Sequence, residues 1–429
     1  MDVDAFLSSP LGELWQVLPL ASLCSSVALA QPKTSAGRKG WVDVEGALAL
    51  MFLKHYYQSS DAKVIETFNG SLHYQLFTGL VLSPGEQIKD ATLLSSWRSK
   101  FGEYMDVEMF QRILQYHWKS HLSATHVNKQ DATCVESYIT YPTSIKLLWR
   151  ATEWVKLRMK EICKATHQRQ PRNKFKDQKR KQRVYQLLKK PSHKQRLKRK
   201  KALIHHLEVM LKQLENLGTE HLKISHQERL EVIKAMFKQQ KDHYKDPDSK
   251  IENRIVSLHK PYVRPIIRGK ENKPVEFGAK LHIYQVDNLE FIEHTSFDAF
   301  NETTRFEATI NHHEAHFGVV KQVAADKIYH TNKNRNICSQ KDIFHNFTPK
   351  GKAPKDPIIN KQNRKMREIL SVDRGTRLEG AFGNVKNHYL GKANKARTKE
   401  NEIIWNYFMI HSANASKIRN KVSQEKNKD

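Results

Sequence analysis

A dense run of basic residues constrains this 429-residue chain more than any other feature. Between Arg169 and Lys201 there are sixteen Lys and Arg residues and one acid, Asp177. Like charges at this density repel one another and need counter-charge to stay compact. The run therefore predicts contact with a polyanion rather than an ordinary solvated face.

The residues after the run predict a long helix. Apolar side chains recur there at alternating steps of four and three, namely Leu203, Leu207, Met210, Leu214 and Leu217. Such a heptad-like stripe is interpreted as packing, with a return helix near Ile233 and Phe237. Residues 151–250 are therefore expected to form a basic helical hairpin inserted into a larger domain. Contacts to DNA are expected from two of its basic triplets: Lys179, Arg180, Lys181, Lys198, Arg199 and Lys200.

The overall charge indicates the class of partner. A formal net charge of +28 and a pI near 9.8 exceed what solubility requires, which favours nucleic acid, and DNA first. The apolar stretch at residues 14–30 is interrupted by Gln16 and Pro19 and is too short to cross a membrane. Asp2 and Asp4 stand where a secretory signal has basic residues. No membrane partner is expected.

The cysteines indicate the compartment. They lie far apart without the spacing of a disulfide framework or a zinc ribbon: Cys24, Cys134, Cys163 and Cys338. A reducing, cytoplasmic and nucleoid-associated location is therefore expected.

Local patterns divide the chain into domains. Residues 1–125 predict an all-helical N-terminal domain that binds DNA, although packing alone also explains its pattern. Strand-like segments at 127–139, 276–286, 290–294 and 318–325 are interspersed with helical ones at 302–317 and from about 364 to 389. This predicts an α/β domain at 126–150 and 251–416, α+β overall, with a polar tail at 417–429.

Three acids occupy special places in this pattern. Asp131 lies inside the first strand, Asp326 follows a later strand, and Glu379 lies on the last predicted helix. Each has a simple alternative role, as a strand end, a turn cap or an exposed helix residue. Ligands of open α/β sheets collect near strand ends, so the three carboxylates could share one edge. Carboxylates suit Mg²⁺, and two ions about 4 Å apart can stabilise both oxygens of a phosphoryl transfer.

The sequences around these acids resemble those of the DDE transposases of bacterial insertion sequences, in the group with an InsH-type N-terminal domain. The similar blocks are DATCVESYITYPT around Asp131, QVAADKIYH with the following NKNRN around Asp326, and RLEGAFGNVKNHYLG around Glu379. The resemblance is loose over 40–145 and good over 255–415.

The resemblance implies a ribonuclease H-like mixed sheet flanked by helices and an enzyme with catalytic, metal-binding Asp131, Asp326 and Glu379. It implies two Mg²⁺ (or Mn²⁺) ions, cleavage at transposon terminal inverted repeats, and transfer of the freed 3′ hydroxyl into target DNA. A homodimer is expected in the synaptic complex. The alternative is a non-catalytic DNA-binding protein, domesticated or decayed.

The Glu379 block also contains basic residues. Lys386, seven positions after Glu379, is expected on the same helical face, near a DNA phosphate. Relatives often have Arg four residues before the Glu, where this chain has Gly375, and either Arg374 or Arg377 could substitute. Two other carboxylates compete with the three acids: Asp287, and Asp373 in the same segment as Glu379.

Overall fold

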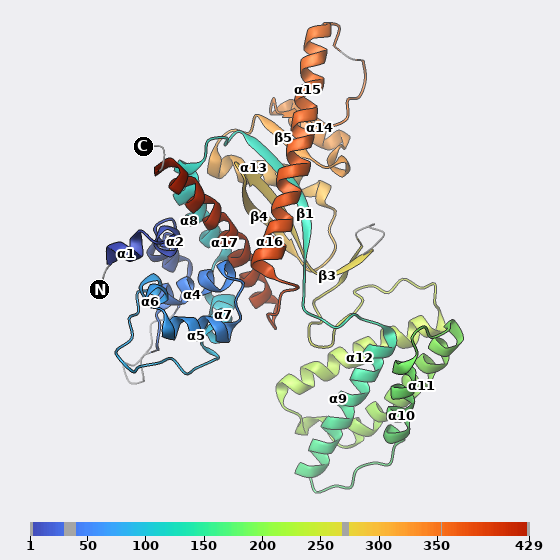
Figure 1. Cartoon of the computed structure of the whole chain (residues 1–429). Coiled ribbons are helices and arrows are strands. Elements are labelled where there is room, and N and C mark those ends of the chain that lie inside the picture. Colours follow the sequence, from blue (N-terminus) through green and yellow to red (C-terminus); the bar gives the residue numbers. More distant parts are fainter. Residues whose placement is uncertain (1–2, 30–39, 268–273, 353, 427–429) are drawn as a thin grey trace. The chain divides into compact units, whose positions relative to one another are not determined.

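A computed structural model describes residues 3–29, 40–267, 274–352 and 354–426 (Figure 1). The chain forms two compact units, unit 1 with residues 1–138 and 279–429 and unit 2 with residues 139–278. The N-terminal helices therefore share a unit with most of the sheet. No helix among the described residues is long and apolar enough to cross a membrane.

The N-terminal part of unit 1 is all helical. Its elements are α1 (Val3–Leu7), α2 (Pro10–Gln16), α3 (Leu20–Leu23), η1 (Cys24–Ser26), α4 (Val44–Tyr56), α5 (Asp61–Gly70), α6 (Leu72–Thr78), α7 (Leu93–Tyr104), α8 (Val107–Trp118) and η2 (Lys119–His121). Side-chain caps start several of these helices: Asp43 accepts from Gly46 N, and Ser60 accepts from Lys63 N. The predicted all-helical character is confirmed.

The sheet forms the centre of unit 1. Its strands are β1 (Val127–Glu136), β3 (Val275–Val286), β4 (Leu289–Ser296), β5 (Gln322–Ala325) and β6 (Phe344–His345). The order is β4-β3-β1-β5-β6; β1 pairs with β5 and β5 with β6 in parallel, while β3 and β4 form an antiparallel hairpin. Asp287 and Asn288 turn this hairpin with positive φ at both residues, a backbone conformation that Asp and Asn tolerate well. The predicted α+β class is confirmed.

Helices complete unit 1. They are η4 (Glu302–Arg305), α13 (Phe306–Phe317), η5 (Lys327–Tyr329), α14 (Asn332–Gln340), α15 (Pro357–Asp373), η6 (Arg374–Leu378), α16 (Glu379–Val385), η7 (Lys386–Leu390) and α17 (Lys399–Lys426). Figure 1 shows α15 and α16 as one continuous helical run, in which η6 and η7 are π-helical turns. The run ends at Gly391, whose φ of 77° favours glycine.

The polar tail predicted from residue 417 is wrong as far as residue 426. Those residues belong to α17, because Lys417 pairs with Glu290 at 2.5 Å and Lys421 with Asp287 at 3.1 Å. Residues 427–429 lie outside the described part. The N-terminal helices pack on the same α17, where the Phe408 ring lies 5.1 Å from those of Phe52 and Phe110. This packing explains why both ends of the chain belong to one unit.

The described residues of unit 2 contain four main helices, so the prediction of a hairpin of two helices is wrong. They are α9 (Ser144–Ala165), α10 (Phe175–Leu187), α11 (His193–Asn216) and α12 (Ile224–Lys245), with η3 (Thr219–His221) and with β2 (Pro265–Ile267) beside the start of β3. The predicted stripe on α11 is buried, as expected for packing: Leu203, Leu207, Met210, Leu214 and Leu217. The stripe needs more apolar surface than one return helix offers, and α9 supplies it through residues such as Val155 and Met159.

Candidate active site

One arginine joins the three acids. The Arg374 guanidinium lies 3.0 Å from an Asp131 carboxylate oxygen, 3.2 Å from Glu379 and 3.6 Å from Asp326. The acids come from β1, from the end of β5 and from the start of α16, and they are up to 248 positions apart (131 to 379). The fold therefore brings the three predicted residues together around one cation.

A π-helical turn gives Arg374 its position. The Glu379 N–H donates to Arg374 O, five residues back, where an α-helix would use the residue four back. In an α-helix the residue four positions before Glu379 would lie beside it, which is Gly375. In this wider turn the residue five positions before Glu379 takes that place, which is Arg374. This resolves the departure at Gly375, because Arg374 lies at the acids. Arg377 instead pairs with Asp373 at 2.8 Å.

Asp131 is the most buried of the three acids, with 18% of its side chain exposed. Burial raises the pKa of its carboxyl to about 6, opposed by a hydrogen bond from Ala132 N and by Arg374. The nearby carboxylates of Glu302 and Asp326 add to the increase in this pKa. Asp131 is thus held in a setting that disfavours an uncompensated negative charge.

Asp326 and Glu379 are more open to solvent, with 52% and 59% of their side chains exposed. Asp326 is nevertheless fixed at its backbone, since Asn346 bonds both the N–H and the carbonyl of Ala325 just before it. The site thus has one buried and two accessible carboxylates.

Carboxylates are the ligands that a hard divalent cation prefers, and three of them here share the positive charge of Arg374. Within the described ranges, no group of three or more His, Cys, Asp or Glu side chains has a metal-binding arrangement. The guanidinium lies between the carboxylates, and a metal ion would have to displace it.

The two competing carboxylates have other partners. Asp373 lies 2.6 Å from the buried Lys129 of β1 and also binds Arg377. Asp287 accepts from Ser123 and pairs with Lys421. Neither has an ion pair with Arg374 among those of the described chain, so both suit use as control positions.

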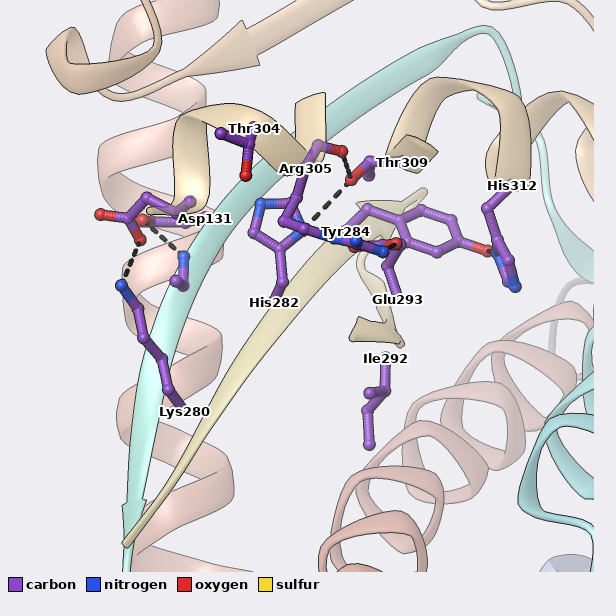
Figure 2. A network of polar contacts seen from close by, with 12 residues as sticks. Asp131, Lys280, His282, Tyr284, Ile292, Glu293, Thr304, Arg305, Thr309 and His312 are labelled. Atoms are coloured by element: carbon purple, nitrogen blue, oxygen red, sulfur yellow. Dashed lines mark hydrogen bonds and ion pairs between the residues drawn. The ribbon is translucent and has the colours of Figure 1, made fainter. Parts of the chain in front are cut away.

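A buried polar network lies next to the acids, and Figure 2 shows His282 beside Thr309, which also bonds the Arg305 carbonyl. His282 bonds Tyr329 as well, at 2.8 Å. His282 also lies 3.2 Å from Glu293, which binds Arg305. Tyr329 is fully buried, so it packs and does not stack on a base. The network makes the wall behind Asp131 rigid.

Two residues near the acids had no distinctive sequence signal. Glu302 acts electrostatically on Asp131 and lies 3.6 Å from Lys280 on β3. Lys280 also donates to Phe300 O at 2.9 Å. Glu302 is the first residue of the helix predicted at 302–317, where an acid is common for reasons of helix stability alone.

The basic residues predicted to contact DNA differ in exposure. Lys179, Arg180, Lys181 and Lys198 are exposed and Lys200 is partly exposed. The prediction that Arg199 contacts DNA is wrong, because its guanidinium is buried. It donates to Gln178 and Gln182 and so joins α11 to α10. Its neighbours on α11 turn outward, whereas Arg199 faces the helix interface.

Lys386 is partly buried at the start of η7. The structure therefore keeps it on the helical run that begins with Glu379, and its predicted contact with a phosphate stays a prediction.

Comparison with protein families finds a match at the N-terminal end of the chain. Residues 2–100 match the family described as "Transposase domain (DUF772)". Searches of the curated proteins and of the solved structures found no match. The match supports a transposase-related role for the chain.

Proposed function

We propose that this chain is a DNA transposase of the DDE type, with a ribonuclease H-like catalytic domain. Asp131, Asp326 and Glu379 form its catalytic site, and its substrates are transposon ends and target DNA. The observation that carries the proposal is the meeting of these acids around Arg374. The N-terminal transposase-domain match and the mixed sheet with parallel β1, β5 and β6 support it.

The site suits phosphoryl transfer. Two Mg²⁺ or Mn²⁺ ions held by the acids would lower the pKa of the attacking hydroxyl group and neutralise the leaving oxygen. In the first step water attacks the phosphorus at the transposon end, the bond to the 3′ oxygen breaks, and that oxygen gains a proton. In the second step the new 3′ hydroxyl attacks a target phosphodiester and displaces a target 3′ oxygen. No covalent protein intermediate is required.

The residues of the chain have distinct roles in this proposal. Asp131 anchors the site from the rigid centre of the sheet, while Asp326 and Glu379 approach from the more exposed side. Arg374 offsets part of the negative charge of the cluster before substrate binds. When DNA is bound, the Arg374 guanidinium pairs with a phosphate in place of the carboxylates. Lys386 is proposed as a further phosphate contact along the same helical run.

Single substitutions test the assignment. Asp131→Asn, Asp326→Asn and Glu379→Gln should each lower Mg²⁺-dependent cleavage of DNA carrying the transposon ends by about 10³-fold or more, roughly 4 kcal/mol of transition-state stabilisation. DNA binding should be largely retained. Asp373→Asn and Asp287→Asn are matched controls that should cleave within a few-fold of the wild-type rate. Full cleavage by any of the three site variants would overturn the assignment.

A non-catalytic DNA-binding protein is the second candidate. The observation that favours it is the arginine that closes the acid cluster. Such a protein would bind DNA without nicking it in Mg²⁺ or Mn²⁺, and the three site variants would then behave like the wild type.

A further inference from the structure

A large groove in unit 1 has no role in the site described above. Its volume is about 1170 Å³, and it is bordered by α4, α5, α7, η7 and the start of α17. Pockets for small molecules usually measure roughly 300–1,000 Å³ and are mostly apolar. This groove is larger and is lined mainly by hydroxyl and basic side chains. A segment of a polymer suits it better than a small metabolite.

Three helices begin at the groove. Ser60 and Asp61 start α5, Thr92 starts α7, and Thr398 precedes α17. Helix N-termini carry partial positive charge and N–H groups that bind anions, although one such end by itself defines no site. Three of them at one groove favour a ligand with several negative groups.

The basic side chains of the groove are not balanced by acids. Five cations line it, Lys54, Arg98, Lys392, Lys395 and Arg397, against the single carboxylate Asp61. Asp61 is already bound by Lys54 at 2.5 Å and Arg98 at 2.8 Å.

The other three cations are exposed and have no ion pair or side-chain hydrogen bond within the described part of the chain: Lys392, Lys395 and Arg397. The charge of Lys395 contributes to lowering the pKa of Lys54, after the larger effect of burial. The groove is therefore electropositive without a partner inside the protein.

Two buried ring nitrogens beside the groove also have no partner. The Nε2 atom of His55 and the Nε1 atom of Trp405 accept or donate no hydrogen bond, and these side chains are only 1% and 7% exposed. Lys54 and Arg98 lie over the Trp405 ring, 4.6 Å and 4.9 Å from its centroid. Unsatisfied buried polar atoms are rare, and these two lie in side chains that line the groove.

We propose that this groove binds the phosphodiester backbone of DNA. A protein partner is disfavoured, because protein interfaces are depleted in lysine and enriched in large apolar side chains at their centre. The inference rests on the proposed function and extends it to a second DNA contact, separate from the acids.

The groove lies at the end of the helical segment formed by α16 and η7, which begins at Glu379. Tyr389 and Leu390 line the groove, about ten residues later. At about 1.5 Å per helical residue, the groove lies about 15 Å from Glu379. At about 3.4 Å of duplex axis per phosphate, this distance of about 15 Å spans about four to five phosphates of one strand. DNA bound in the groove would thus reach the acids within half a helical turn of duplex.

Binding of a fluorescein-labelled DNA duplex of arbitrary sequence, measured by anisotropy in EDTA, tests the groove. The triple variant Lys392→Ala, Lys395→Ala, Arg397→Ala should weaken binding about tenfold, and the slope of log K against log salt should become shallower by about 2–3. The charge-conserving triple Lys392→Arg, Lys395→Arg, Arg397→Lys should bind like the wild type. Equal affinity and slope for both triples would overturn the proposal.

Ser96 gives a second, independent variant. It is exposed in the first turn of α7 and lines the groove. Ser96→Glu places a carboxylate where the helix N-terminus stabilises it, so folding should be retained while DNA affinity falls about fivefold. Ser96→Gln should have no effect. An unchanged affinity of Ser96→Glu would contradict the groove.

The outcomes separate this inference from the proposed function. Normal binding by the groove variants together with inactive acid variants would overturn the groove alone. Weak binding by the groove variants with active acid variants would overturn the catalytic assignment alone. Tighter binding of a matched RNA, or no binding of DNA by the wild type, would count against both.

Discussion

The acid cluster of unit 1 and the basic surface of unit 2 handle charge in opposite ways. In the cluster three carboxylates share one guanidinium, and the whole set is held by strands and a helical turn. On α10 two cations, Arg180 and Lys181, share the single acid Asp177, and most of their neighbours have no acid at all. Charges brought together from distant parts of the sequence require a specific fold, whereas a run of like charges can be recognised from composition. The difference suggests chemistry at the first region and affinity at the second.

Removal of Arg374 should have the largest effect of the changes that probe this contrast. Arg374→Ala should lower cleavage about 10²–10³-fold, the usual cost of losing one charge-stabilising donor at a reacting centre. Because the guanidinium competes with a cation for the acids, the same variant should gain more thermal stability from added Mg²⁺ than the wild type does. Single-turnover cleavage and thermal unfolding measure the two effects.

Arg377→Ala is the matched control, since Arg377 binds Asp373 and not the three acids. A loss of cleavage in Arg377→Ala as large as in Arg374→Ala would show that the π-helical turn does not select between the two arginines.

The pH dependence of stability should reveal the buried acid. Asp131 has a folded-state pKa of about 6 against an ordinary 3.8, so the folded protein holds a proton that the unfolded chain loses. Stability should therefore fall as pH rises from about 4 to 6 and stay low above that. In EDTA, Asp131→Asn should remove this penalty and gain up to about 3 kcal/mol at pH 7, with no gain below pH 4.

Urea unfolding at several pH values measures this effect. The control is Asp326→Asn, whose side chain is half-exposed and whose substitution should change stability by less than about 0.5 kcal/mol. If Asp131→Asn and Asp326→Asn gained the same free energy of unfolding at pH 7, burial of Asp131 could not be the cause.

The basic surface should give the smallest and most salt-dependent effect. The triple variant Lys179→Ala, Arg180→Ala, Lys181→Ala should weaken DNA binding by about tenfold or less and reduce the salt slope by about 0.9 for each phosphate that the variant no longer neutralises. Cleavage at saturating DNA should be unchanged. Anisotropy across a salt series measures the slope, and an unchanged slope would mean that this surface faces solvent.

Much of the sheet, and the choice of three acids that meet at Arg374, could be predicted from the sequence. Local patterns placed the hairpin of β3 and β4, the strand before Asp326 and the end of the helical run at Gly391. These features depend on neighbours in sequence, such as alternating apolar residues and a glycine with positive φ.

Features that depend on tertiary contacts were not predictable in this way. The π-helical turn that selects Arg374 has no known sequence code, and Glu302 joins the site only because η4 packs there. The basic density of residues 169–201 concealed Arg199, whose burial is set by facing glutamines on α10. The leucine stripe of α11 indicated burial but not how many helices would supply it.

The position of unit 2 within the chain has a consequence for how such proteins change. The chain leaves the sheet after β1 and returns to it in β3, and these are adjacent strands. Lys129 contacts Gln285, while Thr133 and Val135 face Leu281 and Ile283 across one small cavity, so the exit and the re-entry lie at the same end of the strand pair. Removal of the intervening 140 residues (139–278) would delete β2 and the first four residues of β3, while the order β4-β3-β1-β5-β6 would stay the same. The region is thus an insertion between two adjacent strands, and its exchange for another segment of chain would leave the remaining strand pairs of unit 1 in place.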